Sequence, residues 1–311
     1  MTISGARFSI FGLLLLTAVL LPSTADAASK DALQAVQDAT VNIYCTYKSG
    51  NKLYSSTGSG VFIDSRGVIL TNAHVVVPYL VTDKKGAQAS TCTVRTGSPA
   101  RDRYTASILY VSPAWMEANV EALRKRDKGG TGVGDAALLY VTEATKGELP
   151  ATFPTLSFDA APILSVAEGE EVVAAGFPAG DKSFKQIRSR LAYVAAEPEI
   201  TSIRSYVRPY SDVLMLSGSE AGSSGVSGGP VARADGQLIA IANAADTKSK
   251  EGERVLRAIT LSHIDRFILA ETGSSLTTML AGDLALRAQI TNLLLSADLK
   301  KDITSALLRK R

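Results

Sequence analysis

A serine set among glycines is the first stretch of this sequence that could carry out a reaction. Ser227 lies in the run GVSGGP, residues 225–230. Glycines let the backbone turn tightly and leave the neighbouring N–H groups uncovered by side chains. An exposed hydroxyl beside such donors is what acyl transfer requires. The other interpretation is a flexible Gly/Ser loop without chemistry, and the partner residues decide between the two.

A serine hydroxyl needs a base, and the chain has 2 histidines, His74 and His263. An imidazole is suited to taking a hydroxyl proton near neutral pH. His74 closes the apolar run VILTNAH, which predicts a strand end, and Asp135 opens the run DAALLYV, where a carboxylate is costly unless paired. A buried carboxylate usually orients a catalytic imidazole. His74, Asp135 and Ser227 therefore form a candidate triad, and we expect His263 to be a capping or packed histidine.

Three blocks of the sequence carry a family resemblance. The blocks TGSGVFIDSRGVILTNAHVV, GDAALLYV and GVSGGPVARADGQLIAIANA resemble, in this order, the signature blocks of trypsin-like serine proteases, and most closely the bacterial HtrA-like group. The resemblance covers about residues 41–264 and implies an all-β fold of two six-stranded antiparallel barrels, with the triad between them. By position, it implies Ser227 as nucleophile, His74 as general base and acid, and Asp135 as the orienting carboxylate. It also implies an oxyanion hole made by the backbone N–H groups of Gly225 and Ser227.

One position departs from the family pattern. Val226 stands where trypsin-like enzymes usually carry Asp or Asn. In digestive relatives an aspartate there pairs with a new N-terminus after zymogen cleavage, and valine cannot form that pair. A catalytically silent trypsin-like binding or chaperone module therefore stays open beside an endopeptidase. An esterase acting on small acyl esters is a further alternative.

The serine run also fits a rival pattern, the G-x-S-x-G nucleophile elbow of α/β-hydrolases. That elbow needs a helix directly after the serine, and Gly228-Gly229-Pro230 is a poor helix start. It also needs an acid and then a histidine downstream, where only His263 is available. The protease interpretation is therefore favoured.

The resemblance also indicates how substrate would bind. It implies that the backbone of residues 241–244 pairs with a peptide, so we predict Ala221, Ala242, Asn243 and Ala244 as substrate-binding residues. Ala221 lies six residues before the serine, where trypsin keeps an acid. This argues against Arg or Lys at the cleavage position and favours small or medium apolar side chains.

Composition limits the class of protein. The chain has 311 residues, 46% hydrophobic content and a formal net charge of +3. The apolar share is ample for a globular core, and so small a charge gives no reason to expect nucleic acid as a partner. We expect protein or peptide substrates, no cofactor, and no metal, since two cysteines alone make a poor metal site.

Residues 1–27 have the pattern of a secretory signal. Arg7 supplies a positive charge, residues 10–21 an apolar core, and residues 25–27 a small-residue cleavage site. The core is short for a bilayer span, so cleavage is favoured over an uncleaved anchor. We expect a mature bacterial chain that begins near Ala28, has no stable membrane span, and is periplasmic or secreted.

The two cysteines, Cys45 and Cys92, allow one disulfide in an exported protein. They fall in predicted strands at residues 40–47 and 91–96. The trypsin resemblance makes these the first and fourth strands of the first barrel, which are neighbours. A disulfide and a pair of buried free thiols both stay open, because pairing depends on distance.

Short strands with turn residues between them are typical of barrels. We place the first barrel at 28–142, a connection at 143–167, the second barrel with its closing helix at 168–272, and a helical tail at 273–311. Strands are predicted at residues 40–47, 53–64, 91–96, 104–111 and 135–141, and then at 171–176, 187–195, 201–207, 213–217, 237–242 and 255–261.

Helical patterns are predicted at residues 115–128, 262–272, 274–295 and 297–308. HtrA-like proteins usually carry a PDZ domain after the second barrel, but the residues here are too few for one. We expect this amphipathic tail to pack on a barrel or to join copies of the chain in a homo-oligomer.

Overall fold

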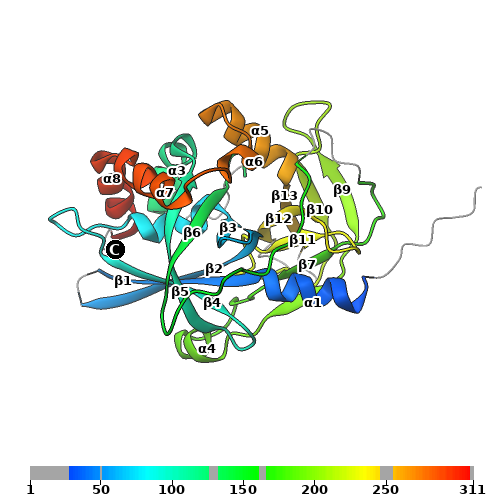
Figure 1. Ribbon diagram of the computed structural model, residues 1–311, viewed down its shortest axis with the longest axis horizontal. Helices are drawn as coiled ribbons and strands as arrows, with labels where there is room; N and C mark the ends of the chain where they lie inside the picture. The colour runs from blue at the N-terminus through cyan, green and yellow to red at the C-terminus, as the bar shows by residue number, and fades with distance from the viewer. Residues whose placement is uncertain (1–27, 50, 126–131, 161–165, 246–254, 309–311) are drawn as a thin grey trace, which may run out of the picture.

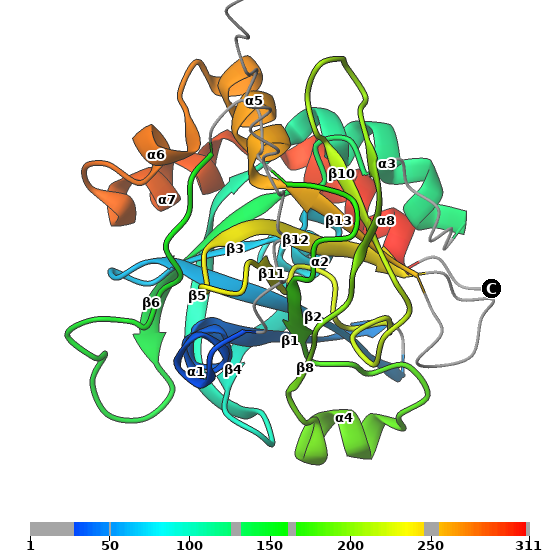
Figure 2. The same ribbon diagram turned by 90° about the vertical axis from the view of Figure 1, so that its right-hand side faces the viewer.

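Two β-sheet units lie side by side, with helices around them (Figures 1 and 2). The computed structural model describes residues 28–49, 51–125, 132–160, 166–245 and 255–308. The secretory signal expected at residues 1–27 lies outside the described residues. The prediction of a trypsin-like double barrel with a C-terminal helical tail is confirmed.

The first unit is a closed antiparallel barrel with the strand order β1-β2-β3-β6-β5-β4. Alternate residues of a strand share a face, and in β1 the residues Val41, Ile43 and Cys45 fill the barrel core. The strands are Thr40–Ser49 (β1), Lys52–Asp64 (β2), Val68–Thr71 (β3), Ser90–Thr96 (β4), Arg101–Val111 (β5) and Ala137–Ala144 (β6).

A disulfide joins two strands of this barrel. Cys45 and Cys92 face each other directly in the ladder between β1 and β4, and their sulfur atoms are bonded. Of the two states that the sequence left open, the structure therefore has the disulfide rather than free thiols.

The second unit is a curled sheet with the order β8-β7-β11-β12-β13-β10-β9, one strand more than predicted. The edge strand β9 curls back toward β7, because Glu199, before β9, forms a bridge with Glu171, before β7. The Ile200 N–H also donates to the Glu170 carbonyl at 2.9 Å, so the sheet closes into a half-barrel. The strands are Val173–Gly176 (β7), Val194–Ala196 (β8), Ile200–Arg204 (β9), Val213–Leu216 (β10), Pro230–Ala232 (β11), Leu238–Ala245 (β12) and Leu256–Thr260 (β13).

The strand predicted at residues 187–195 is wrong. That region holds the helix α4, Phe184–Arg190, followed by the short strand β8. Ser183 and Gln186 form a reciprocal capping box at the start of α4, which satisfies two backbone N–H groups and favours a helix over a strand. A further helix, α1 (Lys30–Ala39), begins at the N-cap Ser29 and was not anticipated.

Of the four C-terminal helices, the last two return to the first barrel. The four are α5 (Leu261–Thr272), α6 (Leu276–Met279), α7 (Leu284–Leu294) and α8 (Ala297–Leu308). The single helix expected at 274–295 is broken between α6 and α7, where Asp283 caps the second piece. Leu295, Leu299 and Ile303 enter the core of the first barrel, and α8 lies along α3 (Pro113–Lys125), as Figure 1 shows. Across the described residues, no helix has the length and apolar character needed to cross a membrane.

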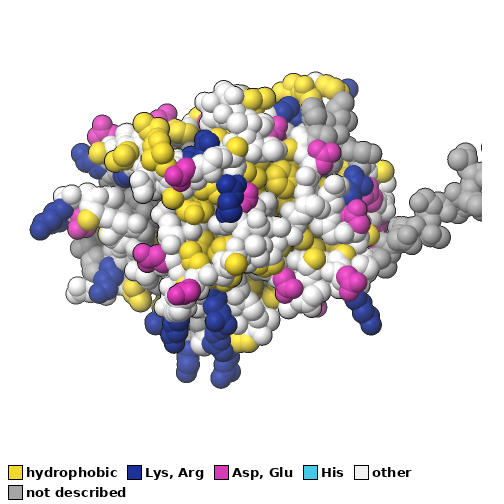
Figure 3. Space-filling model, in the orientation of Figure 1, with side chains coloured by type: hydrophobic (Ala, Val, Ile, Leu, Met, Phe, Trp, Pro, Cys, Tyr) yellow, Lys and Arg dark blue, Asp and Glu magenta, His cyan; other side chains and the backbone are white. Residues whose placement is uncertain are grey.

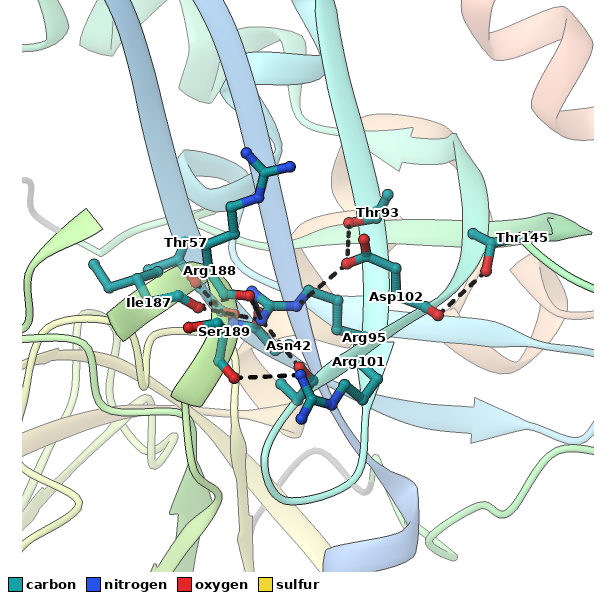
Figure 4. A network of polar contacts seen from close by, with 12 residues as sticks. Asn42, Thr57, Thr93, Arg95, Arg101, Asp102, Thr145, Ile187, Arg188 and Ser189 are labelled. Atoms are coloured by element: carbon teal, nitrogen blue, oxygen red, sulfur yellow. Dashed lines mark hydrogen bonds and ion pairs between the residues drawn. The ribbon is translucent and has the colours of Figure 1, made fainter. Parts of the chain in front are cut away.

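A buried arginine ties the two units together (Figure 4). Arg95 on β4 is 1% exposed. Its guanidinium donates to the carbonyl oxygens of Ile187 at 3.2 Å and Arg188 at 3.0 Å, and to the side chain of Asn42 at 3.2 Å. Asp102 pairs with its Nε at 3.4 Å. Because the last carbonyls of a helix lack partners within the helix, this cation stabilises α4 and fixes it against the first barrel.

Candidate active site

His74 lies where β3 gives way to a short helix. All four residues of β3 are apolar or β-branched and buried. The chain then passes through the extended Asn72 into α2, Ala73–Val76. This holds the imidazole of His74 in the first turn of α2, with 35% of its side chain exposed.

Asp135 lies two residues before β6, after a turn with positive φ at Gly132 (80°) and Gly134 (69°), and is 6% exposed. Its carboxylate accepts the His74 N–H at 3.0 Å, meets His74 Nδ1 at 2.8 Å, and accepts the Asn243 side-chain amide at 2.7 Å. Burial alone would raise the pKa of Asp135, but the charge and hydrogen bonds of His74, with the Asn243 amide, lower it below its ordinary value. The carboxylate is therefore ionised at neutral pH.

This carboxylate fixes the state of the His74 ring. An ionised carboxylate can only accept, so Nδ1 of neutral His74 carries the proton and Nε2 keeps its lone pair. Burial acts to lower the pKa of His74, but the charge and hydrogen bond of Asp135 outweigh it and raise the pKa above 6.5. The ring thus has a fixed orientation and a free lone pair, which are the properties that a general base needs.

Ser227 lies in the loop between β10 and β11 and contacts both sheet units. Its carbonyl accepts the Ser59 N–H of β2 at 2.8 Å, and its hydroxyl donates to the Asn243 carbonyl of β12 at 3.0 Å. Asn243 therefore contacts Ser227 through its backbone and Asp135 through its side chain. This single residue brings the hydroxyl, the carboxylate and, through the carboxylate, the imidazole into one hydrogen-bonded group.

The glycine before Val226 shapes the loop around the serine. Gly225 has φ 99°, and a Cβ there would lie 2.6 Å from the carbonyl oxygen of Phe177, so only glycine fits. Its own carbonyl accepts the Ser59 hydroxyl at 2.8 Å. Within the described part of the chain, the N–H groups of Gly225 and Ser227 have no hydrogen-bond acceptor. Both are available to an oxygen that gains negative charge.

A family model of the trypsin-like peptidase domain matches residues 58–241, more than half of the 311 residues. The chain belongs to the trypsin-like peptidase family. It is similar to the solved structure of the HtrA-type protease AlgW with decapeptide, at 18% identity and a TM-score of 0.48, over 78% of this chain and 67% of that one. It is also similar to the Rv3671c protease from M. tuberculosis in its active form, at 18% identity and a TM-score of 0.48, over 88% of this chain and 96% of that one. No curated protein matches the sequence.

The residue that departs from the family pattern is part of the core of this trypsin-like peptidase. Val226 is 0% exposed and packs in the apolar core of the second sheet. The loop is held instead by the Ser59 hydroxyl on Gly225 and by the Ala179 N–H, which donates to the Ser224 carbonyl at 2.6 Å. It therefore keeps its shape without a carboxylate at position 226.

The four residues predicted to bind substrate differ from one another in burial and contacts. Ala221 and Ala242 are 0% exposed and belong to the core of the second sheet. Asn243 is 3% exposed, and its amide is engaged by Asp135. Ala244 lies further along β12, opposite Arg257 of β13. Their assignment to substrate binding stays a prediction.

Three residues that hold this candidate site were missed in the sequence. Besides Ser59, they are Asn72, whose amide donates to the Asp135 carbonyl at 2.8 Å, and Arg257, which donates to Asn243 Oδ1 at 2.8 Å. Ser59 and Asn72 lie inside the histidine block, so their polar side chains within an apolar stretch were a usable signal. Arg257 reaches the site only through the pairing of β12 with β13, which no local pattern reveals.

Among the described residues, no group of three His, Cys, Asp or Glu side chains is placed to hold a metal ion.

Proposed function

We propose that this peptidase is a serine endopeptidase that cleaves protein substrates through an acyl-enzyme. The observation that carries the proposal is the hydrogen-bonded group in which Asn243 links Ser227 to Asp135, and Asp135 holds His74. A hydroxyl, an oriented imidazole and a buried carboxylate are the three groups that this chemistry needs.

In the first step, the Ser227 hydroxyl turns from the Asn243 carbonyl toward His74. His74 Nε2 takes the proton as the serine oxygen bonds to the substrate carbonyl carbon. The carbonyl π electrons move to its oxygen, which the Gly225 and Ser227 N–H groups stabilise. His74 then gives the proton to the leaving amine as the C–N bond breaks, and water repeats the sequence on the acyl-enzyme.

The end of β12 supports a peptide substrate. β11 pairs with β12 only as far as Ile241, whereas β13 pairs with it as far as Ala245. Among the described strands, the last residues of β12 therefore have a neighbour on one side only. An extended peptide can add on the open side through main-chain hydrogen bonds, close to Ser227.

Covalent labelling with a fluorophosphonate, with the modified residue located by mass spectrometry, tests this function. We expect labelling at Ser227 in the wild type, none in Ser227→Ala, and very slow labelling in His74→Ala. Both variants are checked for folding by thermal melting. A folded wild type that does not label would establish the silent module instead. Labelling and ester hydrolysis with casein left intact would establish an esterase.

We also propose export through a cleaved signal at residues 1–27. The disulfide between Cys45 and Cys92 supports it, because disulfides persist in oxidising compartments. Expression of the full chain in a bacterium, followed by N-terminal sequencing of the periplasmic and medium fractions, tests the proposal. A start near Ala28 is expected, and an intact chain retained in the cytoplasm contradicts it.

Self-association through the C-terminal helices is proposed on the apolar face of α7. Leu286, Ile290, Leu293 and Leu294 share one side of this helix, and the last two are 83% and 77% exposed. Apolar surface gathers over these helices in Figure 3. Light scattering should give a dimer or larger species that Leu293→Lys reduces to a monomer, whereas a monomeric wild type refutes the proposal.

A further inference from the structure

The second histidine is buried near the proposed site, and the catalytic steps above do not use it. His263 lies in the first turn of α5 and is 7% exposed. Its backbone N–H donates to the N-cap hydroxyl of Thr260 at 3.1 Å. Capping is therefore a backbone function, and the contacts of the imidazole require an explanation of their own.

One ring nitrogen of His263 faces a buried carboxylate. Nδ1 lies 3.1 Å from Asp212 Oδ1, and Asp212 is 0% exposed. Its other oxygen accepts the backbone N–H groups of Tyr206 at 2.5 Å and Val207 at 3.2 Å. These contacts hold Asp212 ionised and as an acceptor, and its pKa is lowered despite burial. Neutral His263 therefore carries its proton on Nδ1, as His74 does.

The other ring nitrogen faces the turn that delivers Asp135. With the proton on Nδ1, Nε2 of His263 is an acceptor, and the Gly134 N–H donates to it at 3.4 Å. Gly134 is the residue directly before Asp135. A Cβ at Gly134 would lie 2.2 Å from the Phe267 ring, so the turn sits directly on α5. The Tyr206 ring packs against the imidazole at a tilt of 60°, with centroids 5.1 Å apart.

We propose that His263 is a positioning residue for the triad: oriented by Asp212, its neutral ring holds the Gly134 N–H and thereby the turn that places Asp135 against His74. The inference rests on the proposed function, because it assigns Asp135 to the triad. His263 acts through Asp135, and no substrate contact is required of it.

Only a neutral His263 ring can accept the hydrogen bond from the Gly134 N–H. Protonation would place a second N–H opposite the Gly134 N–H, and two donors cannot bond to each other. The charged and titratable groups around the ring are Asp212, Arg266 on the same helix, Tyr206, and Asp135 beyond Gly134. Burial and the Arg266 cation outweigh the attraction of Asp212 and lower the pKa of His263. The ring therefore stays neutral at neutral pH.

Two substitutions test the contributions of the two His263 ring nitrogens separately. In His263→Asn the amide takes the place of Nδ1, so the Asp212 contact is kept and the Gly134 acceptor is lost. In His263→Gln the amide reaches the place of Nε2, so an acceptor for Gly134 is kept. The first readout is imidazole NMR of ¹⁵N-histidine-labelled full chain carrying Ser227→Ala, in which each variant leaves His74 as the one remaining histidine.

We expect the His74 titration to move toward 6.5 in the Asn variant and to stay near its starting value in the Gln variant. With Ser227 restored, kcat should fall about tenfold in the Asn variant and less in the Gln variant, with KM little changed, as the loss of one hydrogen bond predicts. Folded variants that leave both the His74 titration and kcat unchanged overturn the inference.

If neither variant folds, imidazole NMR of the Ser227→Ala chain with both histidines tests the inference. His263 must then appear with its proton on Nδ1 and titrate below 6.5, and a proton on Nε2 or a titration above 6.5 overturns the inference. Because the NMR readout uses chain that lacks Ser227, it is independent of proteolysis. A His74 response in a protein that never labels would refute the proposed function and leave the positioning role in place.

Discussion

The molecule contains two histidine–aspartate pairs. Their Nδ1–carboxylate contacts are nearly the same, but the pKa values of the two histidines shift in opposite directions. His74 meets Asp135 through Nδ1 at 2.8 Å, and His263 meets Asp212 through Nδ1 at 3.1 Å. Yet the pKa of His74 is raised and that of His263 is lowered. A carboxylate partner alone therefore does not set the direction in which the pKa of a histidine moves.

The surroundings explain the difference. Burial acts to lower the pKa of both rings, so burial alone does not separate them. Asp212 is shared with the Arg266 guanidinium, whose charge opposes a second cation on His263. The far nitrogen of His263 faces a backbone N–H, which suits only the neutral ring. The first pair is thus arranged to take up a proton, and the second to stay neutral and hold structure.

Removing each imidazole in turn should give the largest effects among the tests of this contrast. His74→Ala should lower kcat on the order of a millionfold, as loss of a triad base does in subtilisin, with little change in stability because the ring is partly exposed. His263→Ala should lower kcat far less, but should reduce the free energy of unfolding by about 2 to 3 kcal/mol, since it breaks a buried network. Casein hydrolysis and urea unfolding measure the two effects, and comparable kcat losses would remove the distinction.

Replacing each carboxylate by an amide should give the next largest effects. Asp135→Asn should lower kcat about 10⁴-fold, because an amide can no longer enforce the tautomer of His74. Asp212→Asn should cost about 3 kcal/mol of stability, because it weakens the contacts with His263, Arg266 and two backbone N–H groups. Kinetics and chemical unfolding on both variants check this, and a stable Asp212→Asn protein would show that the second pair bears no structural role.

The residues of the first pair could be read from the sequence, and those of the second could not. His74 and Asp135 each lie in a short block with an apolar strand pattern, so local residue order was enough. His263 meets Asp212 across 51 residues and Gly134 across 129. Such contacts exist only after the second sheet and α5 have formed, and a single sequence contains no local trace of them.

The fold, too, has features that the sequence indicates locally and features that depend on contacts between distant residues. The family resemblance predicted both sheet units, and short strands with turn residues between them agreed with it, whereas the strand predicted at residues 187–195 is the helix α4 followed by β8. The Ser183 and Gln186 capping box was the overlooked signal. That α8 covers the first barrel rather than the second depends on core contacts of Leu299 and Ile303, which amphipathic spacing alone cannot assign to a partner.

The pH dependence of catalysis gives a smaller effect, of about tenfold per pH unit on its acid side. Protonated His74 cannot act as a base, and its pKa is raised above 6.5. Half-maximal kcat/KM on the acid side should therefore fall above pH 6.5 and belong to His74 rather than His263. A midpoint below 6.5 would assign the loss of activity to the second pair, and a flat profile would remove His74 as the base.

The smallest effect is on stability, and its sign is the informative part. The raised pKa of His74 means that the folded state binds a proton more tightly than the unfolded chain, so this contribution is full below 6.5 and is lost as pH rises through the folded pKa. The lowered pKa of His263 gives the reverse: its contribution is full above 6.5 and is lost as pH falls through the folded pKa.

Urea unfolding of the wild type, His74→Gln and His263→Gln from pH 5 to pH 8 measures both contributions as differences from the wild type. The two difference curves should slope in opposite directions, because all other titrating groups are common to the three proteins and cancel. Parallel curves would mean that both imidazoles respond only to their carboxylates. The Arg266 charge and the Gly134 N–H would then have no influence on the second pair, and the contrast between the two pairs would fail at its physical cause.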